Sequence, residues 1–217
     1  LLKMLARVPP EKLGREYYMF EAQAARLPRF ASGAIYIPIK AAFEKYRTQY
    51  SGSVKGSLIA YLVKHSEGEA ASLLTEELRS SDEGATRGLL DGLTRSGLSP
   101  MTHKLLLERL ESDDGAVAAD AAWRLSDHST EVADREKLIN RLTRWRREWG
   151  SRIEEVNSRK SPEAIQSQGS IEREIVIALT RGKAWKGTPE ETDRLAKGCL
   201  SKYCKDQFPK IFPPIPE

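Results

Sequence analysis

The sequence repeats one pattern of residues at an interval of 32 positions. The repeated residues are Leu74, Glu76, Leu78, Ser80 and Asp82, which return as Leu106, Glu108, Leu110, Ser112 and Asp114, while Leu93 returns as Leu125. A period of this size is typical of stacked two-helix units, because one such unit cannot bury its own apolar face. We therefore predict an all-α fold in which helical pairs stack into a right-handed α-α superhelix.

Helix-start signals recur along the chain. Ser99, Ser161 and Thr188 each precede a proline, which pairs an N-cap hydroxyl with a residue whose missing N–H costs nothing in the first turn. For residues 34–37 we favour a loop that enters a helix at Pro38 over a short strand. We expect a mobile loop over 157–169 and helices over 2–7, 11–26, 38–49, 54–65, 69–80, 84–96, 100–111, 116–127, 131–157, 170–181 and 189–205.

The second copy of the pattern carries a family resemblance. Residues 106–117 read Leu-Leu-Glu-Arg-Leu-Glu-Ser-Asp-Asp-Gly-Ala-Val, and residues 121–125 read Ala-Ala-Trp-Arg-Leu. They resemble a HEAT repeat of the short bacterial type, in which an Asp-rich turn joins two helices and a Val-x-x-x-Ala-Ala-x-x-Leu pattern marks the second. Ala118 stands where that family usually has an arginine. The resemblance covers residues 73–128 and implies a HEAT-like helical-repeat array.

Composition divides the chain into three segments. Residues 1–53 are basic and rich in aromatic side chains, which is typical of a helical cap with its own core; a binding surface is the alternative. Residues 54–157 form the HEAT-like repeat region of this prediction. Residues 158–217 are predicted as divergent helices that end in a proline-rich extended tail.

Charge is distributed unevenly, although the formal net charge is only +4. Residues 1–65 hold 11 basic and 4 acidic groups, whereas residues 66–129 hold 6 basic and 13 acidic groups. Residues 131–217 hold 18 basic and 14 acidic groups. The acidic middle would repel a polyanion, so this distribution argues against nucleic-acid binding along the repeat region.

The cysteines and the hydropathy of the chain bear on its location. Cys199 and Cys204 fall in the predicted 189–205 helix, where a separation of five residues places side chains about 140° apart. We therefore predict two reduced, structural cysteines that neither bond to each other nor share a metal. No apolar run reaches the roughly 18 residues of a membrane helix and no secretory signal is found, so we predict a cytoplasmic protein without membrane contact.

A stretch rich in arginine and tryptophan is the first candidate for a binding surface. The candidate residues are Arg141, Arg144, Arg146, Arg147 and Arg152, together with Trp123. Arginines grip phosphates, and aromatic rings stack on bases. The apolar residues of the same stretch instead follow one another at helical intervals, which predicts that Trp145 and Trp149 lie in the core beneath an exposed basic face. For Trp123 we favour a contact with the next repeat over an exposed, ligand-facing ring.

The sequence lacks the motifs of catalysis and of metal or cofactor binding. His65, His103 and His128 are isolated, and no His-x-x-x-His, Cys-x-x-Cys, nucleophile elbow or glycine-rich phosphate loop is present. We therefore predict no catalytic, cofactor or metal residues. The leading hypothesis is a non-enzymatic scaffold that binds a protein or peptide on its concave surface, as one module of a larger protein. The alternatives are a nucleic-acid-binding module that uses the basic flanks and, third, a catalytic module such as a glycosylase or lyase.

Overall fold

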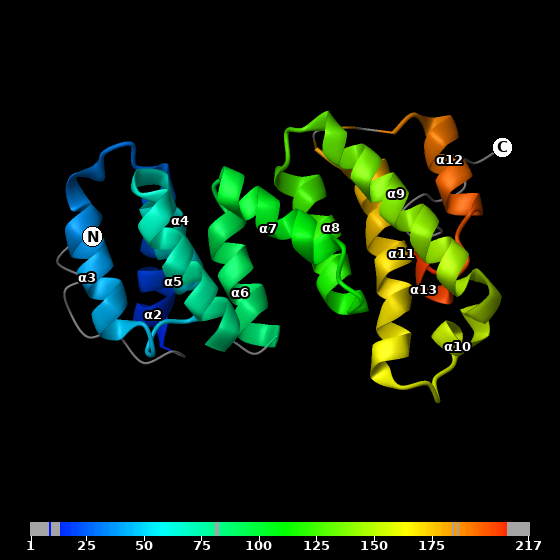
Figure 1. Cartoon of the computed structure of the whole chain (residues 1–217), viewed down its shortest axis with the longest axis horizontal. Helices are drawn as coiled ribbons and strands as arrows, with labels where there is room; N and C mark the ends of the chain where they lie inside the picture. The colour runs from blue at the N-terminus through cyan, green and yellow to red at the C-terminus, as the bar shows by residue number, and fades with distance from the viewer. Residues whose placement is uncertain (1–8, 10–13, 81–82, 184, 186, 208–217) are drawn as a thin grey trace. The chain divides into compact units, whose positions relative to one another are not determined.

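The computed structural model describes residues 9, 14–80, 83–183, 185 and 187–207, and this part of the chain is helical throughout, with no strand (Figure 1). The longer helices are α2 (Arg15–Ala24), α3 (Tyr36–Tyr46), α4 (Gly52–His65), α5 (Glu67–Ser80), α6 (Glu83–Thr94), α7 (Pro100–Leu110), α8 (Gly115–His128), α9 (Val132–Trp149), α11 (Glu163–Arg181) and α12 (Pro189–Lys197). The shorter ones are η1 (Leu27–Arg29), η2 (Gly33–Ile35), η3 (Gly150–Arg152), α10 (Ile153–Asn157) and α13 (Lys202–Lys205). The predicted all-α class is confirmed for the described residues.

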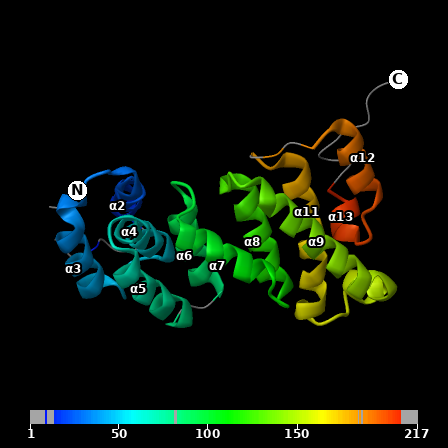
Figure 2. The same cartoon turned by 45° about the horizontal axis from the view of Figure 1, so that its top comes forward.

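The chain forms two compact units that divide between Thr102 and His103. Each unit is organised around one buried helix. In the first unit α4 contacts α2, η1, α3, α5 and α6. Figure 2 shows α4 with α2, α3, α5 and α6 around it. In the second unit α11 contacts α8, α9, α10, α12 and α13. None of the helices in the described ranges is long and apolar enough to cross a bilayer.

Aromatic side chains fill the N-terminal part of the first unit. Five of them are buried between α2, α3 and the loop before α4: Tyr17, Phe20, Phe43, Tyr46 and Tyr50. The rings of Phe20 and Tyr50 stack with their centroids 5.7 Å apart, and burial raises the pKa of the Tyr50 hydroxyl. Tyr18 and Phe30 are exposed, so the aromatic segment forms a core and leaves part of its rings in solvent.

Glycines set the packing of α4 against α6. Gly56 of α4 faces the α6 backbone so closely that a Cβ there would lie 2.0 Å from the carbonyl oxygen of Leu89. A Cβ at Gly92 of α6 would lie 2.2 Å from the carbonyl oxygen of Ser53. One helical turn earlier, Gly52 of α4 and Gly88 of α6 also lie against the backbone of the opposite helix. Only glycine permits so close an approach of two backbones, which explains why α6 carries two residues that disfavour helix formation.

The Gly92→Ala substitution is expected to destabilise the first unit. Its methyl group would overlap backbone atoms that cannot move without separating α4 from α6, at a cost of about 1–3 kcal/mol that outweighs alanine's higher helix propensity. Gly68 of α5 is the matched control, because a Cβ there meets nothing within 4 Å. Chemical denaturation should show a loss of stability for Gly92→Ala and no loss for Gly68→Ala. Equal stabilities would contradict the close helix contact.

Three predicted helix boundaries are wrong in the second unit. The helix predicted over 131–157 is interrupted by η3, which begins at Gly150. The loop predicted over 157–169 is helical from Glu163 onward, because tertiary contacts stabilise its Ser- and Gln-rich first turns. There the side chain of Gln168 donates to the carbonyl oxygen of Asp113 (2.8 Å), and Gly169 lies against the Tyr203 ring. The helix predicted over 189–205 is split into α12 and α13.

The N-cap signals at Thr188 and Ser99 are confirmed, whereas the one at Ser161 is wrong, because Pro162 is the N-cap of α11 and Ser161 Oγ donates to the carbonyl oxygen of Glu155. Thr188 accepts a hydrogen bond from the backbone N–H of Glu191 and begins α12. Ser99 accepts from the N–H of Thr102 in the first turn of α7 (3.1 Å). Residues 34–37 form no strand, since η2 passes directly into α3 at Tyr36. The helix predicted over 2–7 lies outside the described residues, and the domain boundaries at 53/54 and 157/158 stay predictions.

Candidate functional site

Two of the predicted surface arginines are structural. Arg141 is 4% exposed; its Nε donates to the carbonyl oxygen of Leu110 (3.0 Å) and its Nη2 to that of Ser112 (3.1 Å). It thereby satisfies carbonyl groups that the end of α7 leaves free. Burial, and secondarily the charge of Arg144, lower the pKa of its guanidinium. Arg146 pairs through Nε with Glu172 at 3.1 Å, and Glu172 is fully buried.

The remaining arginines of this stretch lie at the surface. Arg144 pairs with Glu111 (2.6 Å), and Arg152 pairs with Glu155 (2.8 Å). Arg147 is exposed. Because acidic partners accompany these cations, they form a mixed-charge face and no continuous positive strip.

The tryptophans of the second unit differ in exposure. Trp145 is fully buried, as predicted, whereas Trp149 is half-buried with the Arg152 guanidinium 4.6 Å from its ring centroid. Trp123 is 44% exposed, so its ring is available to a ligand. The neighbouring Arg124 lies 5.1 Å from the Trp123 ring and is itself fixed by Asp120 (2.8 Å). Trp123 is therefore an exposed aromatic side chain beside a rigid ion pair.

A groove in the first unit was not predicted from the sequence. Its volume is about 420 Å³, within the range of ligand sites. We call it the α4–α6 groove; its lining residues are Pro28, Ala60, Val63, Lys64, Glu67, Leu93, Ser96, Gly97, Leu98, Ser99, Pro100 and Thr102. Gly97 closes one wall in a turn with a φ of 108°, a conformation that glycine adopts without strain.

The α4–α6 groove is apolar inside and polar at its edge. Val63 and Leu93 are almost fully buried beneath it, and Leu98 remains partly exposed. Lys64 and Glu67 bring opposite charges to the edge, and Lys64 Nζ already donates to the carbonyl oxygen of Pro28 (3.2 Å). Such a site fits an apolar side chain carried by a polar backbone better than it fits a polyanion.

A histidine and two carboxylates meet in the second unit, although the sequence indicated isolated histidines. His103 Nε2 lies 2.7 Å from Asp134 Oδ2, and His103 Nδ1 lies 3.4 Å from Glu131 Oε1. Asp134 is fully buried and also accepts a hydrogen bond from Ser129 Oγ. His103 belongs to α7 and Asp134 to α9; they are 31 residues apart, close to the repeat interval. That interval is the signal that could have brought the two residues together.

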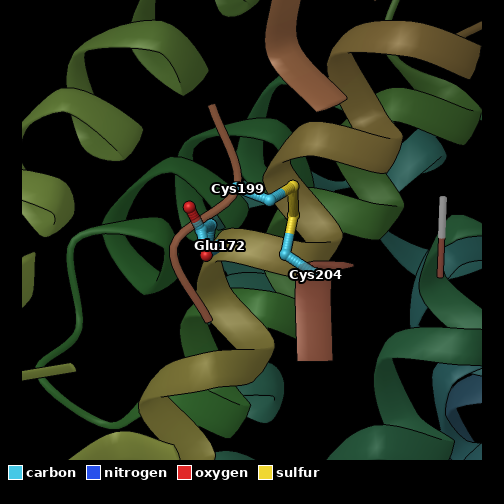
Figure 3. A group of neighbouring side chains, drawn as sticks. All are labelled: Glu172, Cys199 and Cys204. Atoms are coloured by element: carbon cyan, nitrogen blue, oxygen red, sulfur yellow. A yellow bond between two sulfur atoms is a disulfide. The ribbon is translucent and has the colours of Figure 1, made fainter. Parts of the chain in front are cut away.

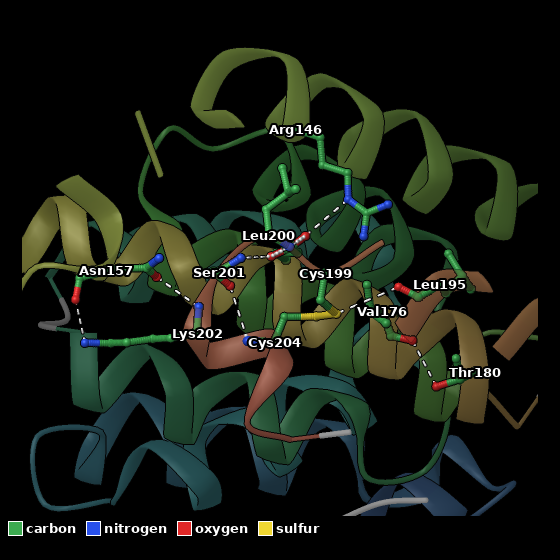
Figure 4. The surroundings of a disulfide bond; sticks show 11 residues. Arg146, Asn157, Val176, Thr180, Leu195, Cys199, Leu200, Ser201, Lys202 and Cys204 are labelled. Atoms are coloured by element: carbon green, nitrogen blue, oxygen red, sulfur yellow. Dashed lines mark hydrogen bonds and ion pairs between the residues drawn. A yellow bond between two sulfur atoms is a disulfide. The ribbon is translucent and has the colours of Figure 1, made fainter. Parts of the chain in front are cut away.

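A second buried cluster surrounds the C-terminal cysteines. Glu172 of α11, Cys199 of the loop after α12 and Cys204 of α13 lie together, as Figure 3 shows. The Glu172 carboxylate accepts hydrogen bonds from the backbone N–H groups of Leu200 (2.9 Å) and Ser201 (2.7 Å). Figure 4 shows the side chain of Arg146 reaching toward this loop near Leu200. The cluster therefore fixes the loop to α11.

The prediction of two reduced cysteines is wrong, because Cys199 and Cys204 form a disulfide. Their Cα atoms lie 5.6 Å apart, which suits a bridge. The 140° helical angle does not apply, since α12 ends at Lys197 and Cys199 lies in a loop. Disulfides are typical of oxidising compartments, and the cytoplasmic location stays a prediction.

Comparison of the chain with protein-family models, with curated proteins and with solved structures gives no match.

Proposed function

We propose that the chain is a non-enzymatic, HEAT-like helical-repeat scaffold that binds an extended peptide of a partner protein in the α4–α6 groove. The repeat assignment rests on the 32-residue pattern and on the burial of residues that it relates. Leu74 and Leu106 are buried, as are Leu93 and Leu125. Leu138, which lies one further interval after Leu106, is also buried. The all-helical composition of the described residues agrees with this assignment.

The groove itself is the observation that carries the peptide-binding proposal. It offers about 420 Å³ of mostly apolar space on a framework of helices, which is room for one apolar anchor side chain and its neighbours. Ser96, Ser99 and Glu67 at its edge supply acceptors and donors for a peptide backbone. A binding site on a rigid scaffold needs little reorganisation when it binds a ligand. We therefore propose an occupant in extended conformation that inserts one apolar side chain into the groove.

The nucleic-acid alternative is less well supported. Of its two central arginines, Arg144 already pairs with Glu111. Of the other candidate arginines, Arg141 is buried, and the partly exposed Arg146 is paired with Glu172. Trp145, which would stack on a base, is fully buried. A phosphate backbone would also have to approach residues 66–129, which hold 13 acidic and 6 basic groups.

The test uses peptides selected from a random display library on the immobilised chain, then labelled and titrated by fluorescence anisotropy. We expect the selected peptides to share an apolar anchor residue. Ala60→Glu places a carboxylate in the groove wall and should weaken binding by about tenfold or more, since an apolar side chain cannot pair with it. Ala164→Glu, at an exposed position of α11, is the control and should change nothing.

Two results would contradict the proposal. One is equal binding of the selected peptides to wild type and Ala60→Glu. The other is saturable micromolar binding of mixed-sequence oligonucleotides in about 0.15 M salt that is lost when Arg144 and Arg147 are both replaced by Gln. That second result would support the nucleic-acid alternative in its place.

A further inference from the structure

We propose that His103, Glu131 and Asp134 form a binding site for a divalent cation of the zinc type in the second unit. One ligand atom from each residue lies within 4.8 Å of the other two. The three residues come from the first turns of α7, the N-cap of α9 and the first turn of α9. An imidazole with two carboxylates is a donor set that suits Zn²⁺ and related transition metals, whereas Mg²⁺ and Ca²⁺ prefer oxygen alone.

Asp134 provides the second, independent observation. Its side chain is fully buried, yet Oδ1 has no hydrogen-bond partner. Lys137 Nζ lies 3.7 Å from Oδ1, beyond hydrogen-bond distance. A buried carboxylate oxygen without a partner is costly, and a cation bound beside it removes that cost. Ser129 Oγ donates a hydrogen bond to the other carboxylate oxygen, Oδ2. Hydrogen bonds of this kind commonly orient the side chains that ligate a metal.

The distances fit a metal after a small adjustment. Ligands 2.0–2.2 Å from a tetrahedral zinc lie about 3.3–3.6 Å from each other. With Asp134 Oδ1 as the ligand oxygen, the 2.7 Å hydrogen bond between His103 Nε2 and Asp134 Oδ2 must open so that Nε2 can face the ion. Glu131 has the freedom to complete the set, because its side chain is 57% exposed. Water can take the fourth position from that open side.

Charge also favours a divalent ion. Two carboxylates face one imidazole, and Lys137, which pairs with Asp134, has a side chain that is 46% exposed and free to turn to solvent. A divalent cation balances both carboxylates at once. Bound metal would link α7 to the start of α9 within the second unit.

Isothermal titration of the full chain with Zn²⁺, with the disulfide kept oxidised, tests the site. We expect one site per chain, no comparable heat with Mg²⁺, and an affinity at least about tenfold lower in His103→Gln and in Glu131→Gln. Zinc should also raise the unfolding temperature of wild type and not of His103→Gln.

His128→Gln is the matched control, because His128 Nε2 lies 3.3 Å from the Asp127 carboxylate and His128 does not belong to the His103 cluster. It should retain wild-type zinc affinity. If His103→Gln does not fold, the exposed Glu131 variant decides the question. Absence of zinc binding by wild type, or an affinity unchanged in His103→Gln or Glu131→Gln, would overturn the proposal.

Discussion

Replacing Glu172 with alanine is expected to lower the free energy of unfolding of the second unit by about 3–5 kcal/mol, the usual cost of removing one partner of a buried ion pair. The Glu172 carboxylate is fully buried and pairs with Arg146 at 3.1 Å. It also accepts hydrogen bonds from the N–H groups of Leu200 and Ser201. Without it, two backbone donors and a guanidinium lose their acceptor in the interior.

Two further variants separate this role from a general effect of charge. Glu172→Gln keeps the shape of the side chain and one acceptor oxygen, so its loss of stability should be smaller than that of alanine. Glu155→Ala removes an exposed carboxylate that pairs with Arg152, and it should leave stability essentially unchanged. Denaturant unfolding followed by circular dichroism, with the disulfide intact, measures all three. A loss for Glu172→Ala no larger than for Glu155→Ala would show that the loop is held without Glu172.

The Leu110→Ala substitution is expected to cost about 2–5 kcal/mol, because it empties a well-packed part of the core. Leu110 is 1% exposed at the end of α7. Its counterpart one interval earlier, Leu78 of α5, is partly exposed, so Leu78→Ala should cost clearly less. Denaturant midpoints of the two variants provide the comparison. An equal or larger loss for Leu78→Ala would contradict the packing described for α7.

The periodic residues are the part of the fold that the sequence predicts well. Leu93 and Leu125, which the 32-residue interval relates, are both buried, whereas of the pair Leu78 and Leu110 only Leu110 is buried. Trp145 is buried where helical spacing places it in the core. The spacing of apolar residues within one helix indicates which face of that helix is buried, so these positions can be predicted from the local sequence alone. From the sequence alone Gly88 and Gly92 are only weak helix formers, whereas their close contacts depend on the matching glycines of α4.

Features that depend on distant contacts could not be predicted in the same way. The Ser- and Gln-rich start of α11 is helical because Gln168 and Gly169 meet residues far away in the chain. The loop between the two disulfide-bonded cysteines is held by Glu172, which lies 27 positions before Cys199. The α4–α6 groove likewise combines residues from several elements, none of which forms a motif.

Hydrogen–deuterium exchange of the full chain with and without a selected peptide tests the scaffold proposal most directly. We expect bound peptide to slow amide exchange in residues 60–67 and 93–102, which line the groove, and to leave α12 unchanged. The same experiment on Ala60→Glu should show no slowing at equal peptide concentration. Slower exchange confined to residues 141–152, or none anywhere at saturating peptide, would contradict binding in the α4–α6 groove.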